Sequence, residues 1–218
     1  MTRAAATERS LRMTSRVRIA VAGALVVSTL AMSGCIPLAA TGVAVGTMAA
    51  LDRRTVGAQA EDQAIELKAR NQIGSVIEQS GGIGVTSFNR KVLLTGQVAS
   101  EQDKRNAERI VAAIDNVRSV HNELQVLGRP SMTTSAADTA ITARVKTALI
   151  NAQDLHANTI KVVTESGTVY LMGLVSRREA DRAAQVAARV AGVQRVVTVF
   201  ELITEEEVTR IHGAPKKN

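Results

Sequence analysis

The sequence predicts an α+β fold made of two tandem αββαβ domains, each with a three-stranded sheet packed against two helices. The first observation behind this prediction is internal repetition. Residues 91–98 (KVLLTGQV) and 168–175 (TVYLMGLV) share one pattern at an offset of 77 residues, and residues 62–65 (DQAI) match residues 138–141 (DTAI) at an offset of 76. The second observation is that helical and strand periodicities alternate in the same order within each copy.

The first half of the second copy predicts a helix followed by a hairpin. Asp138 is predicted to cap the helix at its N-terminus. Residues 159–164 then alternate as a strand, residues 165–167 (ESG) form a turn, and residues 169–175 return as the second strand. One face of the helix carries the expected core stripe, which consists of Ile141, Val145, Ala148 and Leu149.

A second helix and a last strand complete the copy. Ser176 is predicted to cap this helix, which runs to Ala191 with alanines along one side. Gly192 is predicted to end it as a C-cap glycine, and residues 193–200 lead into the last strand. The first copy repeats this order, and its opening helix carries a core stripe of Ile65, Ala69, Ile73 and Ile77.

The repeat also sets the predicted domain boundaries. The stretch between the two copies contains Pro and several Ser and Thr residues, which disfavour regular structure. The chain is therefore divided into a signal peptide (1–34), a lipidated tether (35–61), a first domain (62–127), a linker (128–137), a second domain (138–204) and a charged tail (205–218).

The N-terminal segment has the composition of a bacterial secretory signal. Arg16 and Arg18 precede an uncharged apolar run at residues 19–32, which fits the h-region of a signal peptide and is short for a bilayer span. The run ends in Met-Ser-Gly-Cys at residues 32–35. This motif resembles a lipobox, at which a bacterial prolipoprotein is diacylated on cysteine and cleaved before it. Cys35 is the only cysteine of the chain and is the predicted lipidation site.

Three alternatives stay open for this segment. Translation starts at Met1 or at Met13, and in the first case residues 1–12 are an upstream extension. Cys35 is either lipidated or a buried thiol that follows a signal anchor. Residues 36–51 are apolar but rich in Ala and Gly, which favours a tether over a second transmembrane helix.

The positive charge of the chain does not indicate nucleic-acid binding. The formal net charge is +7, and residues 1–34 carry five arginines against one glutamate, which accounts for +4 of it. The first domain has eight basic and eight acidic residues, and the second has eight and six. An excess this small makes no polyanion-binding footprint, so no nucleic-acid partner is expected.

The two copies together resemble the BON domain. The resemblance is carried by residues 52–57 (DRRTVG), by the V-x-L-x-G-x-V strands at 92–98 and 169–175, and by the GVQRV segment at 192–196. A lipobox followed by this pair is similar to the tandem BON-domain outer-membrane lipoproteins of the DolP (YraP) family. The resemblance implies attachment to the inner leaflet of the outer membrane, facing the periplasm. Ile36, rather than Asp, after the cysteine agrees with enterobacterial sorting rules for that location.

The sequence shows no catalytic or metal-binding constellation. His121, His156 and His212 have no base or nucleophile partner at a recognisable spacing, and the single cysteine leaves no thiol pair for zinc. Gly96 and Gly173 are followed by no GK[ST], so they form no phosphate loop. They are predicted to sit where a helix crosses a strand too closely for a side chain. No enzymatic activity, cofactor or metal is expected.

The opening helix of the second domain carries a second apolar stripe opposite its core stripe. At 100° per residue, four small or apolar residues gather there between two cations, a pattern expected of a helix that lies on a membrane surface. The candidate lipid-binding residues are Ala140, Ala143, Arg144, Lys146, Thr147 and Ile150. In the alternative interpretation, Ile150 packs against the other domain.

The family resemblance implies anionic phospholipid binding through this same helix. One departure weakens it, because relatives often have an aromatic residue where Ala140 stands. The expected function is thus an outer-membrane lipoprotein that binds phosphatidylglycerol or cardiolipin and helps maintain envelope integrity. Two rival functions stay open: a module that recruits a periplasmic division or stress protein, and a soluble, osmotically induced periplasmic protein.

Overall fold

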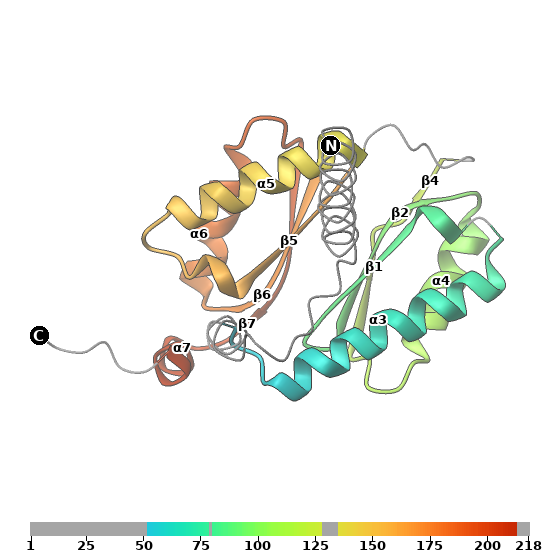
Figure 1. Cartoon of the computed structure of the whole chain (residues 1–218), viewed down its shortest axis with the longest axis horizontal. Coiled ribbons are helices and arrows are strands. Elements are labelled where there is room, and N and C mark those ends of the chain that lie inside the picture. Colours follow the sequence, from blue (N-terminus) through green and yellow to red (C-terminus); the bar gives the residue numbers. More distant parts are fainter. Residues whose placement is uncertain (1–51, 79, 128–134, 213–218) are drawn as a thin grey trace, which may run out of the picture. The chain divides into compact units, whose positions relative to one another are not determined.

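Each copy of the repeat folds as a helix, a hairpin, a second helix and a returning strand (Figure 1). The computed structural model describes residues 52–78, 80–127 and 135–212, so the predicted signal peptide and Cys35 lie outside the described residues. The described residues all belong to one compact unit.

Domain 1 begins with a long helix and ends with two short strands. Its elements are α3 (Val56–Val76), η1 (Ser80–Gly82), β1 (Ile83–Phe88), β2 (Lys91–Val98), α4 (Glu101–Ala112), β3 (Ser119–Asn122) and β4 (Gln125–Val126). Strand β1 pairs antiparallel with β2, and both β3 and β4 pair parallel with β2. Domain 1 therefore has four strands where three were predicted, because the returning chain leaves the sheet at Glu123 and Leu124 and rejoins it.

Domain 2 has the three-stranded sheet that was predicted. Its elements are α5 (Ser135–Asn151), η2 (Ala157–Thr159), β5 (Ile160–Glu165), β6 (Thr168–Val175), α6 (Arg177–Ala188) and β7 (Arg195–Leu202), and a further helix, α7 (Glu205–His212), follows. The sheet order is β5-β6-β7, antiparallel and then parallel. The start of the predicted charged tail is thus helical, with Val208 buried.

Each domain buries one aliphatic core between its two helices and its sheet. The stripes predicted on α3 and α5 are buried, including Ile65 and Ile73 in domain 1 and Val145 and Leu149 in domain 2. A buried Leu, Ile or Val contributes roughly 1.5–3 kcal/mol, so these cores stabilise the fold without aromatic residues.

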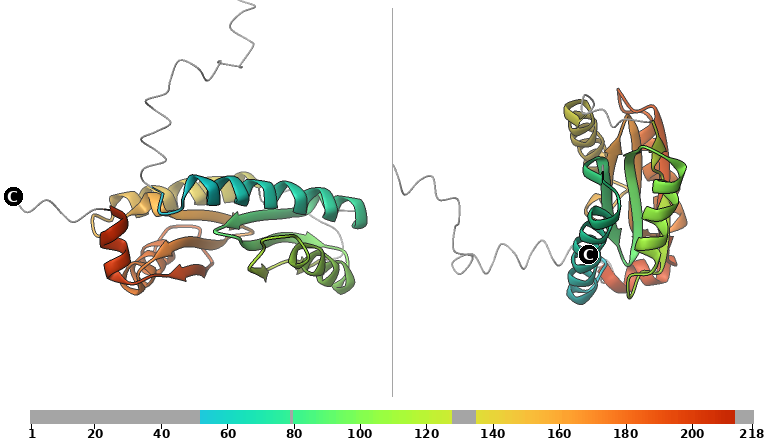
Figure 2. Two further views of the ribbon diagram at one scale, coloured as in Figure 1. Left: turned by 90° about the horizontal axis from the view of Figure 1, so that it is seen from below. Right: turned by 90° about the vertical axis from the view of Figure 1, so that its right-hand side faces the viewer.

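Two of the three aromatic residues, Phe88 and Tyr170, lie in a third cluster between the two sheets, whereas Phe200 packs against the aliphatic core of domain 2. The faces of the two sheets that carry no helices pack against each other, with α3 and α4 outside one sheet and α5 and α6 outside the other (Figures 1 and 2). Phe88 and Leu93 of domain 1 meet Tyr170, Met172 and Val199 of domain 2 in this third cluster. Because both faces of each sheet are covered, the central strands β2 and β6 are buried along almost their whole length.

Asp138 is not the N-cap of α5, as was predicted. It lies within the helix, which begins at Ser135, and its carboxylate accepts hydrogen bonds from the backbone N–H groups of Ser166 and Gly167 in the hairpin turn. Ser166 has a φ of 48°, and the hydrogen bonds help to hold this left-handed turn. Sequence periodicity cannot show such a contact, because the partners lie 28 and 29 residues away.

Other predicted boundaries differ by a few residues. Helix α3 begins at Val56 with Thr55 as its N-cap, six residues before the predicted domain start. Helix α6 ends at Ala188 rather than Ala191. Gly192 consequently lies in the turn before β7, with a φ of 95°, and is not a C-cap residue. Ser176 caps α6 as predicted.

The two strand glycines do face close neighbours, but the neighbours are not crossing helices. A Cβ on Gly173 would lie 2.7 Å from the carbonyl oxygen of Thr159, where η2 leads into β5. A Cβ on Gly96 would overlap the carbonyl oxygen of Gly82, where η1 leads into β1, and the φ of Gly96 is 101°. In both domains the glycine thus makes room for the backbone of the single 3₁₀ turn that precedes the hairpin. In domain 1, Gly81 and Gly82 belong to this turn and Gly84 to the start of β1.

Candidate functional site

The second stripe of α5 is exposed along its whole length. All six candidate residues, from Ala140 to Ile150, are exposed, and Ile150 leaves 64% of its surface open to solvent. The alternative in which Ile150 packs against the other domain is therefore wrong. The opposite stripe of the helix is buried, with Val145 at 0% and Leu149 at 1% exposure, so packing fixes which face α5 turns outward.

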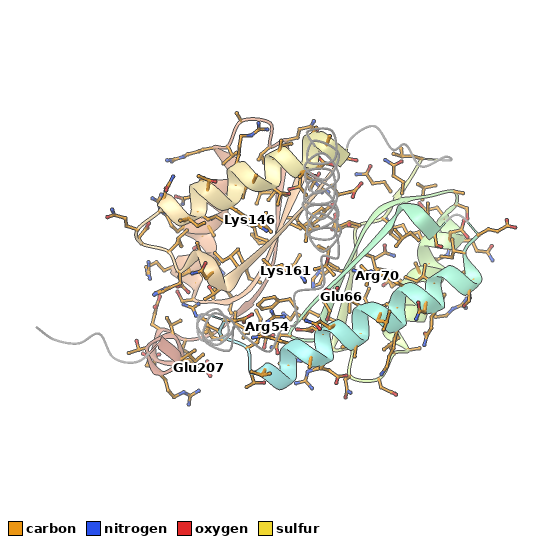
Figure 3. All side chains as sticks on the ribbon, in the orientation of Figure 1. Arg54, Glu66, Arg70, Lys146, Lys161 and Glu207 are labelled. Carbon is orange, nitrogen blue, oxygen red and sulfur yellow. The ribbon has the colours of Figure 1, made fainter. Side chains whose placement is uncertain are left out.

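Two unpaired cations border this exposed stripe. Among the residues that the structure describes, neither Arg144 nor Lys146 takes part in an ion pair, whereas Arg70 on α3 is held by Glu66 at 3.2 Å. Lys146 and Ile150 also line a shallow groove between α5 and the edge strand β5, with Asn158 at its rim. Figure 3 shows Lys146 on α5 and the Glu66–Arg70 pair on α3. The free cations can meet an anionic surface without breaking an ion pair first.

A buried ion pair joins the chain just before α3 to domain 2. The guanidinium of Arg53 donates to both carboxylate oxygens of Glu179, at 2.7 and 2.8 Å, and to the carbonyl oxygen of Leu174 at 2.7 Å. Both side chains are almost fully buried. His156 Nδ1 lies 3.0 Å from Glu179 and 3.4 Å from Arg53, at the solvent side of the pair. We call these three residues the clasp.

Glu179 has two roles at once. As the third residue of α6 it forms a capping box with Ser176, which donates its backbone N–H to the Glu179 carboxylate at 3.0 Å. Burial raises the pKa of Glu179, but the hydrogen bonds from Arg53, Ser176 and His156 outweigh it and lower the pKa to about 2 from 4.5. The carboxylate is therefore ionised at neutral pH.

Further ion pairs join the two domains around the third cluster. Lys161 on β5 contacts Glu66 on α3 at 3.1 Å (Figure 3). At the other sheet edge, Arg118 contacts Glu201 at 3.1 Å and Arg195 contacts Glu123 at 3.1 Å. Arg54, next to the clasp, binds Asp52 and Asp62 and lies 3.9 Å above the ring of Phe88. The segment at 52–54 is thus part of the folded unit, whereas the prediction placed it in the lipidated tether (35–61).

The sequence alone did not assign a role to Arg53, Glu179 or His156. Residues 52–57 carried a family resemblance without a contact, and His156 was expected to have no base or nucleophile partner. One signal was available, because Glu three residues after Ser176 is the sequence signature of a capping box. Its long-range partner, 126 residues away, was not predictable from local patterns.

Two features are absent from the described part of the chain. It contains no helix long and apolar enough to cross a membrane. Nor does it contain a cluster of three or more His, Cys, Asp or Glu side chains that could hold a metal ion.

The BON-domain family model matches residues 61–128 and again residues 137–204. The chain is 32% identical to the outer membrane lipoprotein DolP of Haemophilus influenzae over 178 residues, which cover 81% of this chain and 92% of that protein. It is 30% identical to a 21 kDa hemolysin of Actinobacillus pleuropneumoniae over 70% of this chain and 80% of that one. It is 32% identical to the osmotically-inducible protein Y of Escherichia coli, over 54% of this chain and 60% of that one.

Proposed function

The chain belongs to the BON-domain family as an envelope-associated tandem BON protein, and on this premise we propose that it is a periplasm-facing outer-membrane lipoprotein. In this proposal Cys35 carries the lipid anchor, α5 binds anionic phospholipid such as phosphatidylglycerol or cardiolipin, and the protein helps maintain envelope integrity. The observation that carries the proposal is the exposed stripe of α5, with Ile150 between two cations that have no ion-pair partner in the described residues.

The clasp supports a location of domain 2 close to the membrane. Arg53 is fixed in domain 2, and only 17 residues, 36–52, separate it from Cys35. A chain of that length spans at most about 60 Å when fully extended. An anchor at Cys35 would therefore keep domain 2 within that distance of the bilayer surface, at a high effective concentration of lipid.

The chemistry of the stripe fits a weak interaction at the bilayer surface. Each cation near an anionic surface contributes about 1 kcal/mol, and the contribution falls as salt screens it. Ile150 can insert among the acyl chains, while Ala140, Ala143 and Thr147 allow the helix backbone to approach the headgroups. No aromatic residue stands on this face to act as an interfacial anchor. The lipid anchor thus compensates for a modest intrinsic affinity.

Vesicle flotation of the fragment 52–218 tests lipid binding directly. We expect this fragment to float with vesicles that contain phosphatidylglycerol or cardiolipin and not with zwitterionic phosphatidylcholine vesicles. Replacing Arg144 and Lys146 by Gln together should weaken binding more at low salt than at high salt. The matched control replaces Lys68 and Arg70, at the equivalent positions of α3. Equal flotation on both kinds of vesicle would refute electrostatic lipid recognition.

Lipidation is tested separately at Cys35. We expect Cys35→Ala to leave the fold unchanged and to release the protein from the membrane or to stall it as an uncleaved precursor. Palmitate labelling should be lost in the same variant, and globomycin should block processing of the wild type. A Cys35→Ala protein that still reaches the outer membrane in full would exclude the lipobox.

The same experiments separate the two rival functions. Processing that is insensitive to globomycin would favour a soluble periplasmic protein, which is how the likeness to osmotically-inducible protein Y would then be interpreted. An anchored protein whose soluble fragment ignores anionic vesicles would favour a module that recruits a protein partner.

A further inference from the structure

Strand β7 presents eight residues of unpaired sheet edge. The sheet order β5-β6-β7 leaves one side of β7 without a neighbouring strand. Ile203, just past the strand, donates its N–H to Val175 of β6, and the parallel register then directs the odd-numbered backbone groups toward β6. The backbone groups of Val196, Thr198, Phe200 and Leu202 consequently face the outer edge.

A groove runs along this edge between β7 and α6. It consists of two adjoining hollows that share Ala184. The α6 side of the groove is lined by three alanines and three polar or charged residues, namely Ala180, Ala184, Ala188, Arg177, Asp181 and Gln185. On the strand side it is lined by Val196, Thr198, Phe200 and Leu202. Thr198 is exposed, and Leu202 leaves 53% of its surface open to solvent.

The equivalent groove of domain 1 is closed by a polar bridge. Asn122 on β3 donates its side-chain N–H groups to the carbonyl oxygen of Lys104 and to the carboxylate of Glu108 on α4, both at 3.0 Å. At an offset of 76 residues, domain 2 has Thr198 in place of Asn122, Ala180 in place of Lys104 and Ala184 in place of Glu108. Domain 2 thus lacks both side chains that form the bridge, because Thr198 and Ala184 replace Asn122 and Glu108.

Natural sheet edges are usually protected against pairing with another strand, and β7 is not. Domain 1 blunts its edge by length, because β3 has only four residues and the chain then leaves the sheet. The charged side chains of β7, Arg195 and Glu201, point to the other face, where they pair with Glu123 and Arg118. No proline or inward charge interrupts the eight residues Arg195–Leu202.

We infer that the edge of β7 is an interface with a second copy of this chain, formed by antiparallel pairing of β7 with β7. A two-fold axis at Thr198 places Arg195 of one copy directly opposite Glu201 of the other, so the charges of the two strands are complementary. The same axis pairs Val196 with Phe200 and Thr198 with its own symmetry mate. Opposite charges, aromatic with β-branched residues, and Thr with Thr are the cross-strand pairs that stabilise antiparallel sheets.

Only this register satisfies both charges. The outward-facing backbone groups belong to even-numbered residues, so an even-numbered residue of one copy must pair with an even-numbered residue of the other. One strand can therefore slide along the other only in steps of two residues. A shift in one direction puts Arg195 opposite Val199, and a shift in the other puts Glu201 opposite Val197. The palindromic chemistry of RVVTVFE therefore selects the axis at Thr198.

The pairing joins two three-stranded sheets into one of six strands and covers Leu202. It leaves α5 free in both copies, because α5 packs beside β5 at the opposite edge of the sheet. One existing contact must yield, namely that of the Lys91 ammonium with the carbonyl oxygen of Phe200 at 3.4 Å. The long, flexible side chain of Lys91 allows this displacement.

Site-specific disulfide formation in the full chain tests the interface. Two Cα atoms opposite each other in a hydrogen-bonded antiparallel pair lie about 5.5 Å apart, within the range of a disulfide. We expect Thr198→Cys to give a covalent species of twice the chain mass on mild oxidation in membranes. The matched control, Asn122→Cys at the equivalent position of domain 1, should not. Both variants are repeated in the purified fragment 52–218, which lacks Cys35, to exclude a disulfide through Cys35.

Sedimentation velocity of the full mature protein in density-matched detergent gives an independent measurement. We expect two copies per particle for the wild type and one for Thr198→Pro, because proline at 198 removes only the outward N–H. Thr198→Lys, which puts a charge into the groove, should give the same result. Circular dichroism confirms that each variant is folded.

Three results would overturn the inference. The first is a wild type that stays a single copy at tens of micromolar while Thr198→Cys crosslinks no better than Asn122→Cys. The second is a two-copy particle that both Thr198→Pro and Thr198→Lys leave intact, which would place the interface elsewhere. The third is a crosslinked species of a mass other than twice the chain mass, which would assign the edge to a different protein.

Discussion

Domains 1 and 2 are built on one backbone plan and differ in what they leave exposed. Each has a helical aspartate, Asp62 or Asp138, that holds the hairpin turn by two backbone N–H groups. Each also has a strand glycine that admits the carbonyl oxygen of a 3₁₀ turn. In domain 1 the equivalent of Lys146 is an ion-paired Arg70, and the groove beside the edge strand is bridged. In domain 2 neither Arg144 nor Lys146 has an ion-pair partner among the described residues, and no such bridge spans the groove there. Duplication thus preserved the scaffold, and both interaction surfaces that we propose lie on domain 2.

The largest difference in stability is expected between substitutions at the capping residues of α4 and α6. Asp103 of α4 contacts only Ser100 among the described side chains, whereas the equivalent Glu179 also holds Arg53. We expect Arg53→Met to cost about 3–5 kcal/mol, because it leaves Glu179 buried without its partner. Asp103→Asn should cost about 1 kcal/mol. Urea denaturation followed by circular dichroism measures both, and equal losses would show that the clasp contributes nothing.

The same pair predicts a pH dependence. The folded state holds the pKa of Glu179 at about 2, below its ordinary 4.5. Its stabilisation is therefore fully present above about pH 4.5 and is lost as the pH falls toward 2, and it amounts to about 3 kcal/mol. Melting temperatures of wild type and Glu179→Gln should converge over this range. A constant difference between pH 6 and pH 2 would contradict the assignment.

The next largest loss of stability is expected from substitutions at the two strand glycines. Gly173→Val should cost about 1–3 kcal/mol, because its side chain must displace the Thr159 carbonyl. Gly96→Val should cost more, since the φ of 101° adds backbone strain to a closer contact with Gly82. Calorimetry orders the two variants. An unchanged melting temperature for Gly173→Val would show that η2 yields easily.

Substitutions at the two aspartates that hold the hairpin turns should cause smaller losses of stability. Asp62 accepts hydrogen bonds from Ser87, Asn89 and Arg90 and forms an ion pair with Arg54. Asp138 holds only the two turn N–H groups in the described structure. We expect Asp62→Asn to cost about 2 kcal/mol and Asp138→Asn about 1 kcal/mol. Hydrogen exchange of the turn amides should rise in both variants, and a reversed order would mean that the Arg54 contact is not stabilising.

The smallest expected effect is a gain. Ala140→Trp supplies the interfacial aromatic that α5 lacks, so binding to anionic vesicles should increase a few-fold. Flotation at several lipid concentrations measures it, with zwitterionic vesicles as the control. No increase would show that this end of α5 does not reach the headgroups.

Local sequence periodicity was enough to predict the repeat, the element order and the core stripes. The contacts that join the two domains were not predictable, since Arg53 and Glu179 lie 126 residues apart and neither stands out in composition. Asp138 was assigned to the wrong partner for the same reason. The exposed stripe of α5 could be predicted, because helical spacing alone separates it from Val145 and Leu149. Its lipid ligand stays a prediction.

The most direct test of the central claim, that α5 and not its counterpart α3 meets the membrane, compares one carboxylate on each helix. Ile150 and Leu67 are exposed to nearly the same extent, 64% and 61%. Flotation of the fragment 52–218 on phosphatidylglycerol vesicles is measured for Ile150→Glu and Leu67→Glu, with melting curves to confirm folding. The account predicts at least a tenfold loss of binding for Ile150→Glu and near wild-type binding for Leu67→Glu. Equal losses in the two variants, or a folded Ile150→Glu that binds like wild type, would contradict it.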